Sequence, residues 1–194
     1  MPMMKLGDVA EIRTGVAFRK ANEPSADGTH YVLQAKDVLE ARLDLNDLPL
    51  IELGERGDRH ELATGDVIMV SRGRTVAAPL GEIDSAVPTV AAGSVYVLRP
   101  KNAAVDPMYL AWTINRPGTQ AQLQALAQGS HIPFVSKQSL AKLKIPVPPI
   151  EVQQTIGHVY GLSLREKDLM SQLSELRERL THALCSTAAQ EVKK

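Results

Sequence analysis

The sequence predicts a mixed α/β (α+β) domain followed by one long C-terminal helix with a coiled-coil pattern. Three observations lead to this fold class. The 194 residues are 44% hydrophobic and 23% charged, which is typical of a globular chain with a core. Short β-rich runs and helical segments alternate up to residue 148, where glycine and proline separate them. After Pro149 no further proline occurs, and leucines recur at heptad spacing.

The first part of the chain mixes strands and helices. Runs rich in β-branched and aromatic residues predict three strands, over residues 31–33, 66–70 and 94–98. Asp106-Pro107 predicts a helix start, because proline fits the first helical turn. A second helix is predicted over 120–128, with Gly129 as its C-cap. Residues 143–149 predict a short strand closed by prolines, which cannot continue a ladder, so we expect the domain to span residues 1–148.

The C-terminal helix is predicted over residues 149–187, with a frayed tail over 188–194. Its apolar positions advance in steps of 4, 3, 4 and 3 residues: Leu169, Leu173, Leu176, Leu180 and Ala183. Glu166 is an imperfection on this seam. A helix over residues 151–186 alone runs roughly 54 Å, whereas a domain of about 150 residues has a radius of gyration of about 15 Å. We therefore favour a partner helix, from a second copy or another protein, over packing on its own domain. The expected interface residues are Leu162, Leu169, Leu173, Leu176, Leu180 and Leu184.

Overall charge indicates no partner, because 22 basic residues balance 22 acidic ones. The distribution is more informative. Residues 101–150 hold five basic side chains (Lys101, Arg116, Lys137, Lys142 and Lys144) against Asp106 alone, a local charge of +4. This excess can serve a polyanion even in a neutral protein.

Motifs of the common enzyme classes are missing. The chain has no Gly-rich phosphate-binding loop and no nucleophile elbow, and its five histidines show no HxxxH or HExxH spacing. The single cysteine, Cys185, permits no intrachain disulfide. We therefore predict a protein without catalytic residues and without a dedicated metal site. The N-terminus has no signal-peptide pattern, and no apolar run reaches the roughly 18–20 residues of a membrane span. We expect a cytoplasmic protein that does not use a membrane.

Four basic or polar clusters lie at predicted turns: residues 12–20, 70–75, 128–133 and 135–139. The candidate DNA-binding residues in them are Arg13, Thr14, Arg19, Lys20, Arg72, Arg74, Thr75, Ser130, His131 and Lys137. Basic groups bind phosphates, and arginine also pairs with guanine. Taken singly, each cluster is also typical of solvated surface side chains or of residues that stabilise a loop. Ser136 is in addition expected to cap a helix over residues 137–142. An aromatic content of 4% gives few platforms for stacked bases, which favours duplex DNA over single strands.

Five segments, in order, resemble the target recognition domain of the specificity (S) subunits of type I restriction-modification systems. They are residues 6–15, 65–73, 106–112, 129–133 and 143–154. The last is the most specific, because this family runs from such a proline-rich strand straight into its conserved spacer helix. The resemblance spans nearly the whole chain. It implies that residues 1–148 read duplex DNA and that residues 149–187 serve dimerisation and methyltransferase docking.

One departure from that family bears on the partners. Full-length members carry two recognition domains and two helices, which pair as an antiparallel coiled coil, whereas this sequence has one of each. The resemblance therefore implies a half-size subunit that forms a homodimer, reads a bipartite palindromic site and docks methyltransferase (M) subunits, with a restriction (R) subunit joining the larger assembly. It implies no cofactor here, since S-adenosylmethionine, ATP and Mg²⁺ belong to those partners. The alternative is a non-catalytic adaptor or regulator that pairs with a full-length S subunit or another phage-defence complex.

Overall fold

The computed structural model describes residues 2–17, 25, 27–39, 42–45, 48–83, 87–101, 104–129 and 132–191. The chain divides into two compact units, Met1–His158 and Val159–Lys194. Each unit is described by itself below. Among the residues described, no helix combines the length and the apolar character that a membrane span needs.

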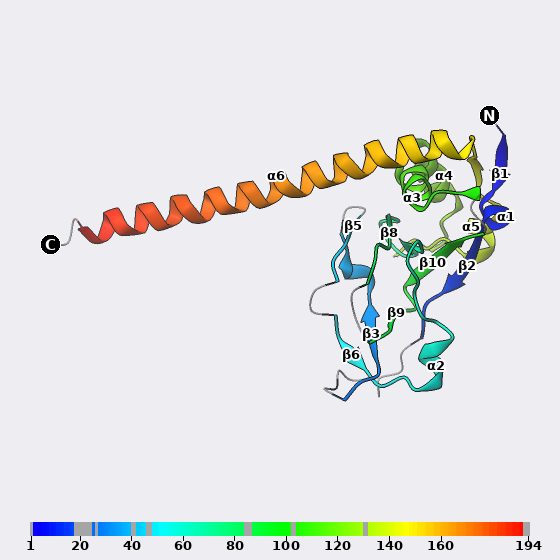
Figure 1. Ribbon diagram of the computed structural model, residues 1–194, viewed down its shortest axis with the longest axis horizontal. Helices are drawn as coiled ribbons and strands as arrows, with labels where there is room; N and C mark the ends of the chain where they lie inside the picture. The colour runs from blue at the N-terminus through cyan, green and yellow to red at the C-terminus, as the bar shows by residue number, and fades with distance from the viewer. Residues whose placement is uncertain are drawn as a thin grey trace. The chain divides into compact units, whose positions relative to one another are not determined.

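The main sheet of the first unit has four antiparallel strands (Figure 1). Their order is β2 (Ala10–Thr14), β10 (Val95–Pro100), β7 (Val67–Val70) and β8 (Ala77–Pro79). Side chains alternate between the two faces of a strand. In β7, Val67 and Met69 therefore join one apolar cluster, and Ile68 and Val70 join another. Both faces of the sheet are covered, and the predicted strands over 66–70 and 94–98 are confirmed.

A second, mixed sheet has three strands: β6 (Leu50–Ile51), β3 (His30–Leu33) and β9 (Thr89–Ala91). β3 is parallel to β9 and antiparallel to β6, and it confirms the strand predicted over 31–33. The 3₁₀ turn η1 (Ala35–Asp37) follows β3. Two short ladders complete the strands, β4 (Val38–Leu39) with β5 (Arg42–Leu43) and β1 (Met3–Lys5) with β11 (Lys144–Pro146). β11 confirms the predicted strand that prolines close.

The described residues of the first unit form five short helices: α1 (Leu6–Val9), α2 (Glu55–Asp58), α3 (Pro107–Asn115), α4 (Pro117–Leu126) and α5 (Lys137–Lys142). α3 begins as predicted. Oδ1 of Asp106 accepts the N–H of Tyr109 at 2.7 Å, and proline stands in the first turn. The predicted cap of α5 is also confirmed, since Oγ of Ser136 accepts the N–H of Ser139 at 3.1 Å.

The helix predicted over residues 120–128 is wrong at both ends. α4 starts at Pro117, which takes its first turn, and ends at Leu126. Ala127 is already extended, because Gln128 pairs through both its N–H and its carbonyl with Phe134. Gly129 is therefore not a helix C-cap. Its φ of +97° belongs to the loop that follows, a conformation that glycine adopts at little cost.

α6 (Ile150–Glu191) is a single helix of 42 residues and confirms the predicted long helix. At 1.5 Å per residue its length is roughly 63 Å. It continues to Glu191, into the segment where fraying was expected. Its turns up to His158 belong to the first unit, and the rest forms the second unit.

A buried glutamine holds the first turns of α6 within the first unit. Gln153 is 1% exposed. Its Oε1 accepts the N–H of Asp106 at 3.0 Å, and its Nε2 donates to the carbonyls of Ala104 at 3.0 Å and Pro148 at 2.8 Å. At Gly157 a Cβ would come within 2.7 Å of Oδ1 of Asp106, so only glycine permits this approach. The start of α6 is thus fixed to the start of α3.

The heptad stripe of the second unit is exposed. The six leucines predicted at the interface are between 43% and 62% exposed: Leu162, Leu169, Leu173, Leu176, Leu180 and Leu184. The described part of the second unit is a single helix, which cannot bury this stripe by itself.

Candidate nucleic-acid interface

Two of the predicted basic clusters lie at one edge of the main sheet. β2 and β7 are both antiparallel to β10, which lies between them, so their C-terminal ends meet where β10 begins. Thr14 pairs with Tyr96 of β10, and Val70 pairs with Val95. Neighbouring strands are about 4.8 Å apart, so the chains leaving β2 and β7 are about 10 Å apart. The register thus brings residues 12–14 and 70–75 to the same edge.

The loop between β7 and β8 presents two arginines. Its base is closed by a hydrogen bond from the N–H of Val70 to the carbonyl of Val76 at 2.9 Å. Gly73, with a φ of +71°, turns the chain. The Ser71 hydroxyl donates to the carbonyl of Ser94 at 2.7 Å. Arg72 and Arg74 are both exposed on this anchored loop.

The loop after α4 crosses the β7–β8 loop. Phe134 pairs in antiparallel fashion with both Gln128 and Arg72, which closes the loop over residues 129–133. The N–H of Gly73 donates to the carbonyl of Pro133 at 2.8 Å, and the N–H of Val135 donates to the carbonyl of Ser71 at 3.2 Å. The predicted clusters over 70–75 and 128–133 are therefore joined through the backbone. Ser130 and His131 lie outside the described residues.

A buried tyrosine supports this crossing. The Tyr96 hydroxyl donates to the carbonyl of Val135 at 2.9 Å. Burial raises the pKa of Tyr96, and the backbone N–H of Lys137 and the charge of Arg72 act in the opposite direction. The backbone of Lys137 and the charged guanidinium of Arg72 thus both lie near the same phenol. The Arg72 guanidinium also lies 5.7 Å from the centroid of the Phe134 ring, a cation–π contact that limits its freedom.

Two further predicted residues flank the crossing. Lys137 is exposed in the first turn of α5. Thr75 is tied to α4, because its hydroxyl donates to Oε1 of Gln120 at 3.0 Å, while the Gln120 amide donates to the carbonyl of Ile114 at 2.8 Å. Thr75 therefore holds the loop in place through its side chain.

Arg13 lies in an internal ion-pair cluster. Asp66, 1% exposed, receives Arg99 in a bidentate pair, with both N–O distances at 2.7 Å. This hydrogen bond raises the pKa of Arg99. Nη2 of Arg13 lies 3.7 Å from Oδ2 of Asp66 and donates to the carbonyl of Glu61 at 3.4 Å. The Arg13 side chain is only 20% exposed. Thr14 is exposed at the end of β2, and Arg19 and Lys20 lie outside the described residues.

The sequence analysis missed the residues that position the candidate interface. Tyr96, Phe134 and Gln120 hold the loops, yet each stands far along the chain from the arginines it supports. Asp66 and Arg99 were missed for the same reason, because antiparallel pairing of β7 and β10 brings them together. The available signals were weak: an aspartate at the start of one strand, and an arginine at the end of another.

The chain matches the protein family described as "Type I restriction modification DNA specificity domain" over residues 1–172. None of the curated proteins matches it. Among solved structures, its fold is similar to the S subunit of a type I restriction-modification system from M. genitalium, at 13% identity and a TM-score of 0.58. It is also similar to the HsdS subunit from Thermoanaerobacter tengcongensis, at 16% identity and a TM-score of 0.60.

A third similar chain comes from a structure concerned with complex assembly and conformational transition of the type I restriction-modification system. The identity is 17% and the TM-score is 0.62. The similarity to the M. genitalium subunit covers 88% of this chain and 41% of that one, and the other two cover 85% of this chain and 37% or 38% of theirs. The chain thus spans about two fifths of the length of these solved structures.

Proposed function

Because the chain belongs to the family of type I restriction-modification DNA specificity domains, we propose that its first unit reads sequence in duplex DNA. The observation that carries the proposal is the backbone-joined crossing of two loops at one edge. It presents Arg72, Arg74 and Lys137 to solvent on an anchored support. Exposed cations on fixed loops provide the phosphate contacts and the arginine forks that groove recognition uses.

The proposal divides the cations by how they are held. Arg72 is pre-oriented over Phe134, so less conformational freedom is lost on binding, which suits a base-reading arginine. Lys137 is a flexible point charge and suits a phosphate contact. Arg13 is engaged with Asp66 and the carbonyl of Glu61, which supports a structural role for it. We keep Thr14, Thr75 and the residues outside the described part as secondary candidates.

The second unit is proposed to be the assembly helix. Each fully buried leucine of the stripe would contribute about 1.5–3 kcal/mol, so a partner helix is strongly favoured. Two copies related by a two-fold axis would place identical recognition units on a bipartite, palindromic site. In the full system this subunit would carry no catalytic residues. It would dock M subunits, with an R subunit joining, and those partners would hold S-adenosylmethionine, ATP and Mg²⁺.

A non-catalytic adaptor remains the alternative function, favoured by one observation, the exposed leucine stripe. Such a protein would pair with a full-length S subunit, or with another phage-defence complex, without reading DNA itself. The two functions differ in what the first unit binds. The adaptor needs the stripe alone, whereas the specificity subunit needs the stripe and the loop edge.

A salt titration of duplex affinity separates the two functions. The affinity of a protein that reads DNA should fall steeply with salt. The logarithm of its association constant should fall linearly with the logarithm of the salt concentration, with a slope of about 0.9 for each phosphate neutralised. Lys137→Glu should weaken binding and lower that slope by about 1. Lys167→Glu, an exposed lysine on α6, is the matched control. A shallow slope that neither substitution alters would support the adaptor.

A further inference from the structure

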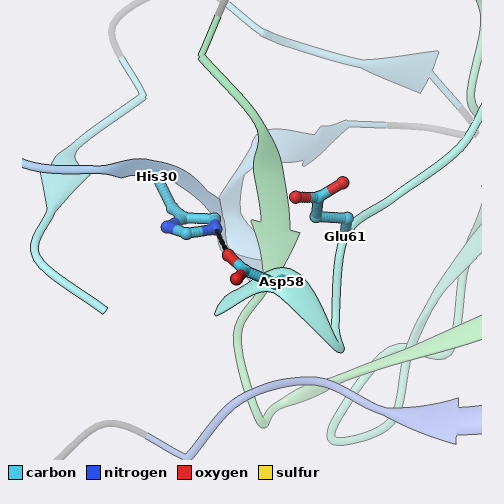
Figure 2. A group of neighbouring side chains, drawn as sticks. All are labelled: His30, Asp58 and Glu61. Atoms are coloured by element: carbon cyan, nitrogen blue, oxygen red, sulfur yellow. Dashed lines mark ion pairs between the residues drawn. The ribbon is translucent and has the colours of Figure 1, made fainter. Parts of the chain in front are cut away.

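Three side chains from two segments that are distant in the sequence meet near α2, at the end of the first unit away from α5 (Figure 1). They are His30 of β3, Asp58 at the end of α2, and Glu61, which follows α2 (Figure 2). One possible ligand atom from each lies within 4.8 Å of the others. We propose that this cluster binds one divalent transition-metal ion of the Zn²⁺ type. The proposal depends on none of the residues of the candidate DNA interface.

The buried histidine supplies the first argument. His30 is 2% exposed, and its Nε2 has no hydrogen-bond partner among the residues that the structure describes. Figure 2 shows this nitrogen directed at the carboxylate of Asp58, with Nε2 3.5 Å from Oδ1. A buried polar atom without a hydrogen bond is costly, so such an atom calls for a ligand.

A threonine contacts the other ring nitrogen of His30. Oγ1 of Thr29 lies 2.9 Å from Nδ1 of His30, 3.1 Å from the backbone N of Leu53 and 3.5 Å from Oε1 of Glu52. When the hydroxyl donates to that carboxylate, its oxygen accepts from both nitrogens. In the metal-bound form Nδ1 then holds the ring proton, and Nε2 presents its lone pair to the ion. This is the arrangement of a metal-ligating histidine whose other nitrogen is oriented by a hydrogen bond.

The distances and charges fit a small divalent ion. Two ligands of a tetrahedral ion, at bonds of about 2.0–2.2 Å, lie roughly 3.4 Å apart, close to the 3.5 Å between His30 and Asp58. Two carboxylates and a neutral imidazole carry −2, which a divalent ion balances. A donor set of one nitrogen and two oxygens favours Zn²⁺ and its neighbours over Mg²⁺ or Ca²⁺. Three protein ligands leave one position for water.

The backbone beside the cluster is shaped for close approach. A Cβ at Gly57 would lie 2.3 Å from Cε1 and from Nε2 of the His30 ring. Only glycine lets α2 pass the ring so closely, and Asp58 is the next residue. The carbonyl of Glu61 in turn accepts from Arg13 and Arg99. An ion here would therefore fasten β3, α2 and the segment that supports the Asp66 cluster, which is a structural role.

The metal alone is the probe. The full chain, stripped with a chelator, is titrated with Zn²⁺ by calorimetry and with Co²⁺ by visible absorption, with Mg²⁺ for comparison. We expect one saturable transition-metal ion per chain, with a Co²⁺ spectrum typical of nitrogen and oxygen ligands. Asp58→Asn combined with Glu61→Gln should weaken binding about 100-fold or more, since removing ligands exceeds the 10–100-fold effect of outer partners. Both carboxylates are exposed, so circular dichroism should show an unchanged fold.

A matched control tests whether an exposed histidine and cysteine on α6 bind the metal instead. His182→Ala with Cys185→Ser removes an exposed histidine and the exposed cysteine of that helix. This variant should bind one ion as the wild type does. Thr29→Val should weaken affinity about 10–100-fold by releasing the ring, and Thr29→Ser should restore it.

Three results would overturn the proposal. The first is a wild type that takes up no saturable ion, together with nitrogen NMR that shows a proton on Nε2 of His30 pairing with Asp58 instead. Binding that survives the Asp58 and Glu61 substitutions would place the ion elsewhere. Binding that only the His182 and Cys185 substitutions abolish would assign it to α6.

Discussion

At the scale of the residue, four arginines of the first unit divide into two kinds. Arg13 and Arg99 contact the buried Asp66, whereas Arg72 and Arg74 are exposed on an anchored loop. The sequence could not separate them, because Arg13 and Arg72 both stand within two residues of a glycine turn. The pairing of β2 and β7 with β10 decides the difference, since it turns Arg13 towards a buried carboxylate.

Arg72→Ala and Arg74→Ala should each weaken binding to a selected duplex. Loss of an arginine that reads a base should weaken binding by about 1–3 kcal/mol and relax selectivity at one position. Loss of a phosphate contact should lower affinity evenly across sequences. Fluorescence anisotropy on matched and mismatched duplexes distinguishes these. Arg59→Ala removes the exposed arginine at the C-cap of α2 and should leave affinity unchanged. Wild-type affinity in both loop variants would remove this loop from the interface.

Asp66→Asn should destabilise the first unit by about 3 kcal/mol. The substitution keeps the shape but leaves the Arg99 guanidinium without its buried counter-ion, and breaking such a pair is costly. The free energy of unfolding in urea measures the loss. The exposed Asp8→Asn should lie within about 0.5 kcal/mol of the wild type. Equal stability of the two variants would mean that the ion pair contributes little.

At the scale of the element, local signals predicted most of the fold. Caps and periodicity located β3, β7, β10, α3, α5 and α6, because those signals act within a few residues. α4 was misplaced where a tertiary contact decides its end, namely the pairing of Gln128 with Phe134. The clustering of His30, Asp58 and Glu61 was not predicted, since these side chains come from β3, from the end of α2 and from the segment after it, and show no metal-site spacing.

Gln153→Ala should destabilise the first unit by about 3 kcal/mol. It removes three hydrogen bonds, namely those to the partly buried N–H of Asp106 and to the carbonyls of Ala104 and Pro148, at about 1 kcal/mol each. Thermal unfolding followed by circular dichroism measures this loss of stability. The neighbouring Gln154→Ala, on the exposed face of the same turn, is the control. Equal melting temperatures for the Gln153 and Gln154 variants would contradict a stabilising role for the Gln153 hydrogen bonds.

Leu173→Glu with Leu176→Glu should convert a dimer into a monomer. The two charges fall on the stripe where a partner helix would pack, and burying them is unfavourable. Light scattering at micromolar concentration reads the mass. Ser171→Glu with Ser174→Glu adds the same charge off the stripe and should stay dimeric. A wild type that is itself monomeric would instead indicate that the helix pairs with a different chain.

At the scale of the whole molecule, the proposed function gives the reading of DNA sequence to the first unit and the assembly with partner subunits to the second. The family and the fold follow from motifs spread along residues 1–172. The bases that are read do not follow from the sequence, because loop shape and flanking contacts determine them. The basic residues over 101–150 lie in different settings: Lys137 follows the loop crossing at the start of α5, whereas Lys101 donates to the carbonyl of Gly7.

The central claim is tested most directly by sequencing the methylome of cells that express this chain together with its methyltransferase partner. The account predicts one methylated motif made of two inverted half-sites separated by a fixed spacer. Arg72→Ala with Arg74→Ala should relax or abolish that motif, and Arg59→Ala should leave it intact. A motif that is unchanged in the double variant, or no methylation that depends on this chain, would contradict the account.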